Sequence, residues 1–136
     1  MKKLKLYLDN CCFNRPYDDQ NQIIMRIETD AKLNIQSSIK QKNYALIWSF
    51  MLDFENNDNP YDDNKQIIQS WEKIATEFCD FDEKILEQGK ELQKLGIKEN
   101  DSLHIACAIF TNCEYFITTD YKLTTKDVEK IKIINL

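Results

Sequence analysis

The feature that most constrains the fold is the alternation of strand-like and helix-like segments along the whole chain of 136 residues. Residues 44–48 form a nearly continuous apolar run, which is typical of a strand buried on both faces of a parallel sheet. Residues 23–40 instead carry isoleucine at helical spacing, so that one face of the segment is apolar. This alternation predicts a mainly parallel sheet with helices on both faces.

The individual elements can be placed from their apolar periodicity and from the residues that interrupt it. Strands are predicted at residues 4–9, 44–48, 77–81, 115–120 and 131–136. Helices are predicted at residues 23–40, 49–55, 62–75, 82–95, 101–110 and 124–129, with a polar loop at 10–20 and Gly96 ending the fourth helix. The expected architecture is therefore a three-layer α/β/α sandwich, formed by a single domain over residues 1–136.

Composition excludes several classes of protein. No apolar run reaches the roughly 20 residues that cross a bilayer, so we expect a cytoplasmic protein without a membrane contact. A net charge of −5 argues against a non-specific coat for nucleic acid. Five cysteines in no CxxC pattern and a single histidine fit reduced, packed thiols better than disulfides or a zinc site.

Three aspartates occupy positions at which ligands commonly bind. Asp9 follows the first strand and Asp120 follows the fourth, and ligands of open parallel sheets bind beyond the carboxyl ends of the strands. Asp101 lies at the start of a strongly apolar helix. Each residue alone has an ordinary alternative, because aspartate also makes turns and caps helices.

Glu55 is the fourth candidate, and Asp53 competes with it. Met51, Phe54 and Glu55 are spaced so that the carboxylate of Glu55 flanks an apolar helix face. Asp53 lies in the same short helix, and periodicity cannot choose between the two acids.

Taken together, these segments resemble the PIN-domain family, which includes the toxins of VapBC toxin–antitoxin pairs. The resemblance runs in order through residues 6–9, 49–55, 96–106 and 115–120. It implies strand order 3-2-1-4-5, which sets Asp9 and Asp120 on neighbouring central strands. It also implies a catalytic and metal-binding set of Asp9, Glu55, Asp101 and Asp120, with Glu55 preferred over Asp53 and with Thr118 in a supporting position. Asn10, which stands where the family usually has a small residue or threonine, is a further supporting candidate.

The chemistry of such a cluster points to a metal. Four crowded carboxylates repel one another unless some bind protons or a cation. Oxygen ligands with open water positions suit Mg²⁺ or Mn²⁺, which activate water for attack on a phosphodiester. The expected function is a metal-dependent endoribonuclease acting on RNA. The resemblance leaves open a role as the toxin of a toxin–antitoxin pair, an antitoxin partner and a homodimer.

Three further polar residues attract attention beside the acids. Lys122, just after Asp120, and Arg15, in the first loop, are candidates for binding RNA phosphate, and a merely solvated side chain is the alternative. His104 lies three residues after Asp101 on the same helix face. We expect it to be a packed or supporting histidine and not a general base.

Two rival functions remain to be weighed. A phosphoaspartyl phosphatase requires a second acid two residues after the first, where this chain has Cys11, and a receiver domain requires paired acids where it has Asp9 and Asn10. The alternative from another class is a catalytically silent PIN-like protein that binds or scaffolds a partner. The intact set of acids favours the enzyme.

Overall fold

The computed structural model describes residues 3–17 and 20–136. Its sheet has the order β3-β2-β1-β4-β5, and every pair of neighbouring strands is parallel. The strands are β1 (Leu4–Leu8), β2 (Tyr44–Ser49), β3 (Glu77–Cys79), β4 (Tyr115–Thr118) and β5 (Lys132–Asn135). The predicted fold class and strand order are confirmed.

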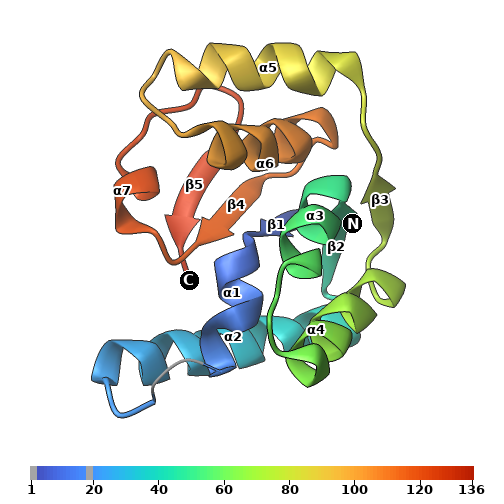
Figure 1. Ribbon diagram of the computed structural model, residues 1–136, viewed down its shortest axis with the longest axis vertical. Coiled ribbons are helices and arrows are strands. Elements are labelled where there is room, and N and C mark those ends of the chain that lie inside the picture. The colour runs from blue at the N-terminus through green and yellow to red at the C-terminus, as the bar shows by residue number, and fades with distance from the viewer. Residues whose placement is uncertain (1–2, 18–19) are drawn as a thin grey trace.

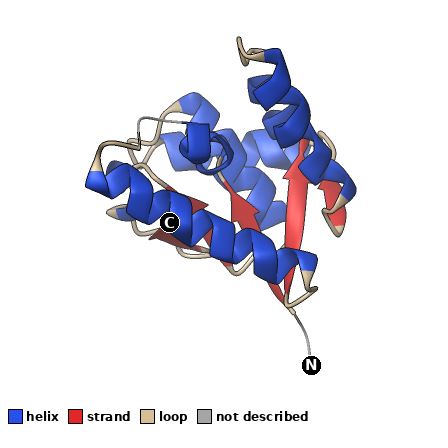
Figure 2. Cartoon of the chain, turned by 90° about the horizontal axis from the view of Figure 1, so that it is seen from below, coloured by secondary structure: helices blue, strands red, loops and turns tan. Residues whose placement is uncertain are grey.

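Helices cover both faces of this sheet (Figures 1 and 2). The α-helices are α1 (Asn10–Asn14), α2 (Ile23–Lys40), α3 (Phe50–Asn57), α4 (Asp62–Gln69), α5 (Glu83–Gln93), α6 (Glu99–Phe110) and α7 (Tyr121–Thr124), with 3-10 turns η1 (Arg15–Tyr17) and η2 (Ser70–Lys73). Helix α6 packs against β2 and β4, and α5 lies on its outer side. Helix α2 crosses the opposite face (Figure 2).

The core explains why the strands read as apolar runs. Leu46, Ile47 and Trp48 of β2 are fully buried, as are Leu8 of β1 and Phe116 of β4. Strands with both faces covered by helices must be apolar on both faces. None of the helices in the described part of the chain combines the length and hydropathy that a bilayer crossing needs.

Two sequence predictions of local structure are wrong. Residues 10–17 are helical where a polar loop was predicted, because Asp9 accepts a hydrogen bond from the Asn10 backbone and starts α1 at once. The last short helix occupies Tyr121–Thr124 and not residues 124–129, because Asp120 caps it through the Lys122 backbone. The other predicted elements exist, and their ends differ by a few residues.

Chain order reverses between β1 and β4, and this reversal fixes where a site can form. The two strands are neighbours in register, with Leu8 opposite Ile117. The Asp9 backbone N–H donates to the Ile117 carbonyl at 2.9 Å, so the first residue after β1 lies beside the end of β4. Side chains that follow these two strands therefore share one edge of the sheet.

Candidate metal centre

The Asp9 carboxylate is held at the end of β1 by two groups. Its Oδ1 accepts from the Asn10 backbone N–H at 2.8 Å, and its Oδ2 accepts from the Thr118 hydroxyl at 3.0 Å. The side chain is buried, so burial raises the pKa of Asp9. The nearby negative charge of Glu55 acts in the same direction, while His104 and the Thr118 hydrogen bond oppose it. Asp9 thus caps α1 and still presents a carboxylate at the sheet edge.

Thr118 joins the two central strand ends. Its hydroxyl oxygen, besides donating to Asp9, accepts from the Asp120 backbone N–H at 3.1 Å. Asp120 itself is exposed, and its Oδ1 accepts from the Lys122 backbone at 3.0 Å. The hydroxyl is fully buried, so this link is shielded from water. It holds the backbone of Asp120 in a fixed position relative to the Asp9 carboxylate.

Glu55 is fixed by His104. Glu55 Oε1 lies 2.6 Å from His104 Nε2, and His104 is fully buried. One potential ligand atom from each of Asp9, Glu55 and His104 lies within 4.8 Å of the others. The structure therefore brings α3, α6 and the end of β1 to one point.

The His104 ring is the middle of a buried hydrogen-bonded chain. Its Nδ1 lies 2.6 Å from the Tyr7 hydroxyl, which in turn lies 2.5 Å from Ser49 Oγ. Burial raises the pKa of Tyr7 well above its usual value, which keeps the phenol protonated. One arrangement of protons satisfies all of these groups. In it the Tyr7 hydroxyl donates to His104 Nδ1, and the N–H at Nε2 donates to Glu55. The sequence predicted His104 as a packed or supporting residue but did not reveal the hydrogen bonds that link it to Tyr7 and Ser49.

Asp53, the competitor of Glu55, is engaged elsewhere. Its Oδ1 accepts from Trp48 Nε1 at 2.8 Å and from Gln69 Nε2 at 2.6 Å. It therefore stabilises the packing of α4 against β2 and α3. Of the two acids that helical periodicity left open, Glu55 therefore lies with Asp9, and Asp53 is held by Trp48 and Gln69.

Asp101 belongs to the same electrostatic cluster. It is half-buried in the first turn of α6, and it forms no capping hydrogen bond with the described residues. Burial raises its pKa first, and the negative charges of Asp9, Asp120 and Glu55 raise it further, against the effect of His104. The negative charges of Asp9, Asp120 and Glu55 therefore act on Asp101, whereas Asp9 and Glu55 are the two of these four acids that converge with His104 on one point.

This repulsion predicts how the metal-free protein responds to pH. A carboxyl whose pKa is higher in the folded than in the unfolded chain loses a stability penalty as pH falls through the folded value. In EDTA, Asp101→Asn should raise the free energy of unfolding at pH 7 by roughly 1 kcal/mol. The gain should shrink at pH 5, and added Mn²⁺ should stabilise wild type more than the variant. Urea denaturation at both pH values measures this. A less stable variant together with a metal-insensitive wild type would reduce Asp101 to a helix-terminal charge.

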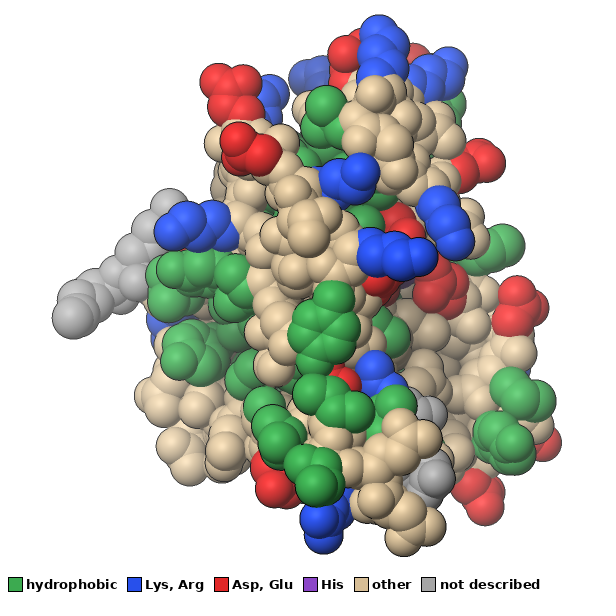
Figure 3. All heavy atoms as spheres, turned by 90° about the vertical axis from the view of Figure 1, so that its left-hand side faces the viewer, with side chains coloured by type: hydrophobic (Ala, Val, Ile, Leu, Met, Phe, Trp, Pro, Cys, Tyr) green, Lys and Arg blue, Asp and Glu red, His purple; other side chains and the backbone are tan. Residues whose placement is uncertain are grey.

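A pocket of about 310 Å³ opens beside these acids, and lysines line it with Asp101 and Asp120. The lysines are Lys98, Lys122 and Lys126. Figure 3 looks onto the side of the molecule that carries α7, where acidic side chains lie in a hollow rimmed by basic ones. The sequence pointed to Lys122 alone. Lys98 lies just before α6 and Lys126 just after α7, and no sequence pattern marked either lysine as a residue of the pocket.

Gly96 shapes this pocket. Its φ of +87° lies in the left-handed region, which glycine adopts without strain. A Cβ at this position would meet Lys126 Nζ at 3.2 Å. Gly96 was predicted to end α5. The absence of a side chain at this position also leaves room for Lys126 at the pocket.

The other two predicted residues occupy different settings. Arg15 is mostly buried, and its Nε lies 3.2 Å from the buried carboxylate of Glu28 in α2. It is therefore engaged with α2 and is absent from the lysine-lined pocket. Asn10 lies next to Asp9, and its backbone carbonyl accepts from Asn14. Its buried Oδ1 has no hydrogen-bond partner among the described residues.

The donor set fits a hard divalent cation. Asp9, Glu55, Asp101 and Asp120 offer carboxylate oxygens. Burial raises the pKa values of Asp9 and Asp101, and neighbouring carboxylates raise them further. Magnesium and manganese ions prefer oxygen ligands with open water positions. His104 is a poor ligand because both of its ring nitrogens already have partners.

Comparison with known proteins gives a family and a fold. No curated protein matches the chain. A solved structure, the crystal structure of VapBC2 from Rickettsia felis bound to a DNA fragment from their promoter, is similar over 98% of this chain and 99% of that one, with a TM-score of 0.64 and 17% identity. The sequence pattern of the PIN domain matches residues 49–129, which include Glu55, Asp101 and Asp120. Because this match covers more than half of the 136 residues of the chain, the chain belongs to the PIN-domain family.

Proposed function

We propose that this protein is a divalent-metal-dependent endoribonuclease, with Asp9, Glu55, Asp101 and Asp120 as its metal-binding and catalytic acids. The observation that carries the proposal is the gathering of carboxylates at the edge where β1 and β4 end. Asp9 and Glu55 converge there with His104, and the negative charges of Asp9, Glu55 and Asp120 act on Asp101. Membership of the PIN-domain family supports the same chemistry. Residues 1–136 form the single nuclease domain of this proposal.

The protein's own residues prepare the site in three ways. Thr118 and the Asn10 backbone orient the Asp9 carboxylate, and His104 orients Glu55. Groups whose positions are fixed in advance need not be reordered when the reaction begins. When bound, Mg²⁺ or Mn²⁺ supplies the Lewis acidity that activates water and offsets charge on the phosphate.

The lysine-lined pocket supplies the substrate side of the proposal. A strand of RNA carries a negative phosphate at every nucleotide, and an acidic site repels it unless basic groups stand close by. Lys98, Lys122 and Lys126 share a pocket with Asp101 and Asp120. We propose that they hold phosphates flanking the bond that is cut.

The lysines give a graded prediction. Lys98→Ala and Lys126→Ala should each weaken RNA binding several-fold and lower the salt dependence of binding by about one unit of slope or less. Lys94→Ala is the matched control, since Lys94 is exposed at the end of α5 and pairs with Glu91. Fluorescence anisotropy with labelled RNA at several salt concentrations measures the effect. An equal loss in all three variants would assign binding to general charge and not to the pocket.

The experiment that tests the function uses purified protein with single-stranded and structured RNA. Cleavage should occur with Mn²⁺ or Mg²⁺ and cease with EDTA, and Asp9→Asn should remove it. The second candidate function is a catalytically silent PIN-like binding or scaffolding protein. That alternative predicts no cleavage and weak or absent Mn²⁺ binding at the four acids.

The biological setting belongs to the same proposal. The solved structure that this chain resembles is a VapBC2 complex with DNA. We therefore propose an antitoxin protein as a partner, with this chain as the toxin. The proposed homodimer and cytoplasmic location remain predictions. Co-expression with the product of a neighbouring gene, followed by measurement of the mass of the complex, tests the partner.

A further inference from the structure

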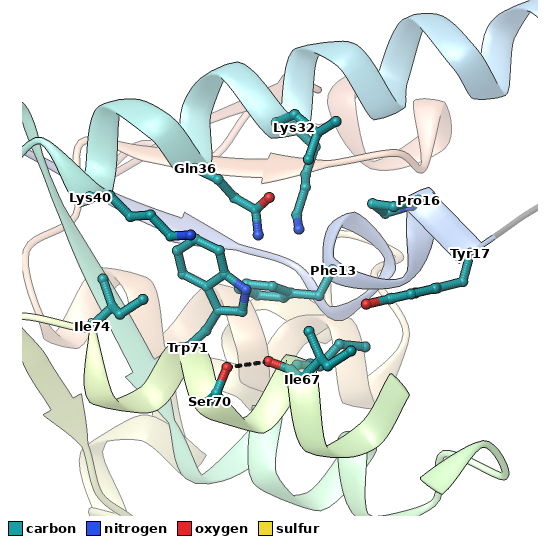
Figure 4. Close-up of a pocket in the computed structure, with 12 residues that line it drawn as sticks. Phe13, Pro16, Tyr17, Lys32, Gln36, Lys40, Ile67, Ser70, Trp71 and Ile74 are labelled. Atoms are coloured by element: carbon teal, nitrogen blue, oxygen red, sulfur yellow. Dashed lines mark hydrogen bonds between the residues drawn. The ribbon is translucent and has the colours of Figure 1, made fainter. Parts of the chain in front are cut away.

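A second pocket, of about 270 Å³, lies away from the acids, between α2 and the α4–η2 segment (Figure 4). Two aromatic residues, Phe13 and Trp71, line its base, and Lys32, Gln36 and Lys40 reach it from α2. Its size falls just below the roughly 300–1,000 Å³ that is usual for sites of drug-sized ligands. The described residues that line it include no carboxylate.

Both lysine ammonium groups lie over aromatic rings. Lys32 Nζ is 5.4 Å from the centre of the Trp71 ring and 5.8 Å from that of Phe13, and Lys40 Nζ is 5.4 Å from Trp71. Cation–π contacts of this length stabilise an ammonium group. Two cations therefore approach the same indole ring within one pocket.

The charge of Lys32 is not neutralised. Lys32 is only 4% exposed, and no ion pair joins it to a carboxylate in the described part of the chain. Burial lowers the pKa of Lys32 to about 8. Cys12 opposes this shift, and the positive charge of Lys40 adds a smaller effect in the same direction as burial. A buried ammonium group without an anionic partner costs folding free energy. The arrangement is the reverse of the acidic site, with surplus positive charge in place of surplus negative charge.

We propose that this pocket binds a small organic carboxylate with an aromatic or branched apolar body. The carboxylate is the anion that the two ammonium groups lack among the described residues, and the Gln36 amide beside them can donate a further hydrogen bond. The apolar body would pack against the Trp71 ring and the side chains of Ile67 and Ile74. A bare inorganic anion would leave these apolar walls unused, so the site should favour the organic acid.

The test uses benzoate as the probe, with benzamide as its uncharged match and inorganic phosphate as an anion without an apolar body. Benzoate should bind with a dissociation constant of about 1 mM or tighter, as expected for a ligand of this size. It should move the indole N–H resonance of Trp71 in the NMR spectrum of the full chain. The Trp48 indole, which donates to Asp53, is an internal control that should not move.

Variants separate a binding site from a merely packed lysine. Lys32→Met keeps the length and apolar stem of the side chain, so it should fold, melt several degrees higher than wild type and bind benzoate at least tenfold more weakly. Lys94→Met should change neither property, and RNA cleavage should stay within twofold in both variants. The proposal is overturned if 50 mM benzoate leaves the Trp71 resonance in place. It is equally overturned if benzamide binds as well as benzoate, or if Lys32→Met binds benzoate as wild type does.

Discussion

Replacement of Asp120 by asparagine should lower RNA cleavage by at least a hundredfold to a thousandfold. The change keeps the shape of the side chain and removes one full negative charge from the proposed metal site. Loss of a single electrostatic element in a prearranged site has effects of this size. Single-turnover cleavage of a labelled RNA in Mn²⁺ measures the rate without a contribution from product release.

The proposed catalytic role of Asp120 can be tested separately from its capping role. Asp120 Oδ1 accepts from the Lys122 backbone at the start of α7, and an asparagine oxygen can accept the same bond. The melting temperature of the metal-free variant should therefore change little while cleavage collapses. Asp30→Asn, on the exposed side of α2, is the matched control and should retain full activity. Undiminished Mn²⁺-dependent cleavage by Asp120→Asn would place the chemistry at another site or in a contaminant.

The layers of the fold follow from pattern, because burial on both faces forces strands such as 44–48 to be apolar throughout. The segments that pattern misjudged are short and depend on a single contact. Helix α1 follows directly from the cap that Asp9 gives to Asn10, and residues 10–17 show no apolar repeat that would predict a helix. Helix α7 begins at Tyr121 because Asp120 caps it there. Such helices are too short for hydrophobic periodicity to detect.

The acidic residues of the candidate site could be identified from the sequence because of the topology of the sheet. Asp9 and Asp120 follow two strands whose carboxyl ends must meet at one edge once the sheet is parallel. The choice of Glu55 over Asp53 came from the family resemblance alone. Its physical basis is that Trp48 and Gln69 take up Asp53, and both contacts are tertiary.

The basic side of the site could not be predicted in the same way. Lys122 is adjacent in sequence to a strand end, whereas Lys98 and Lys126 reach the pocket only because the turn at Gly96 and the end of α7 come together. Arg15 looked equally suitable in the sequence. Its buried ion pair with Glu28 forms across the packing of η1 on α2, which no local pattern reveals.

His104→Ala should weaken Mn²⁺ binding by roughly 10- to 100-fold, the usual effect of removing a group that orients a metal ligand. The variant frees Glu55 from its 2.6 Å contact and leaves the buried Tyr7 hydroxyl with Ser49 in place of its two partners Ser49 and His104. It should therefore also lose stability. Isothermal titration with Mn²⁺, at a temperature at which wild type and variant are both folded, measures the affinity.

Two further variants distinguish positioning of Glu55 from general damage to the fold. Ser49→Ala breaks the same chain at its far end, where Ser49 contacts Tyr7 and caps α3, so it should cost about 1 kcal/mol of stability. Because it leaves the His104–Glu55 contact in place, its Mn²⁺ affinity should stay near that of wild type. His104→Gln retains an N–H that can donate to Glu55 and should recover part of the lost affinity. If Ser49→Ala and His104→Ala weaken Mn²⁺ binding equally, His104 acts through the stability of the fold and not through Glu55.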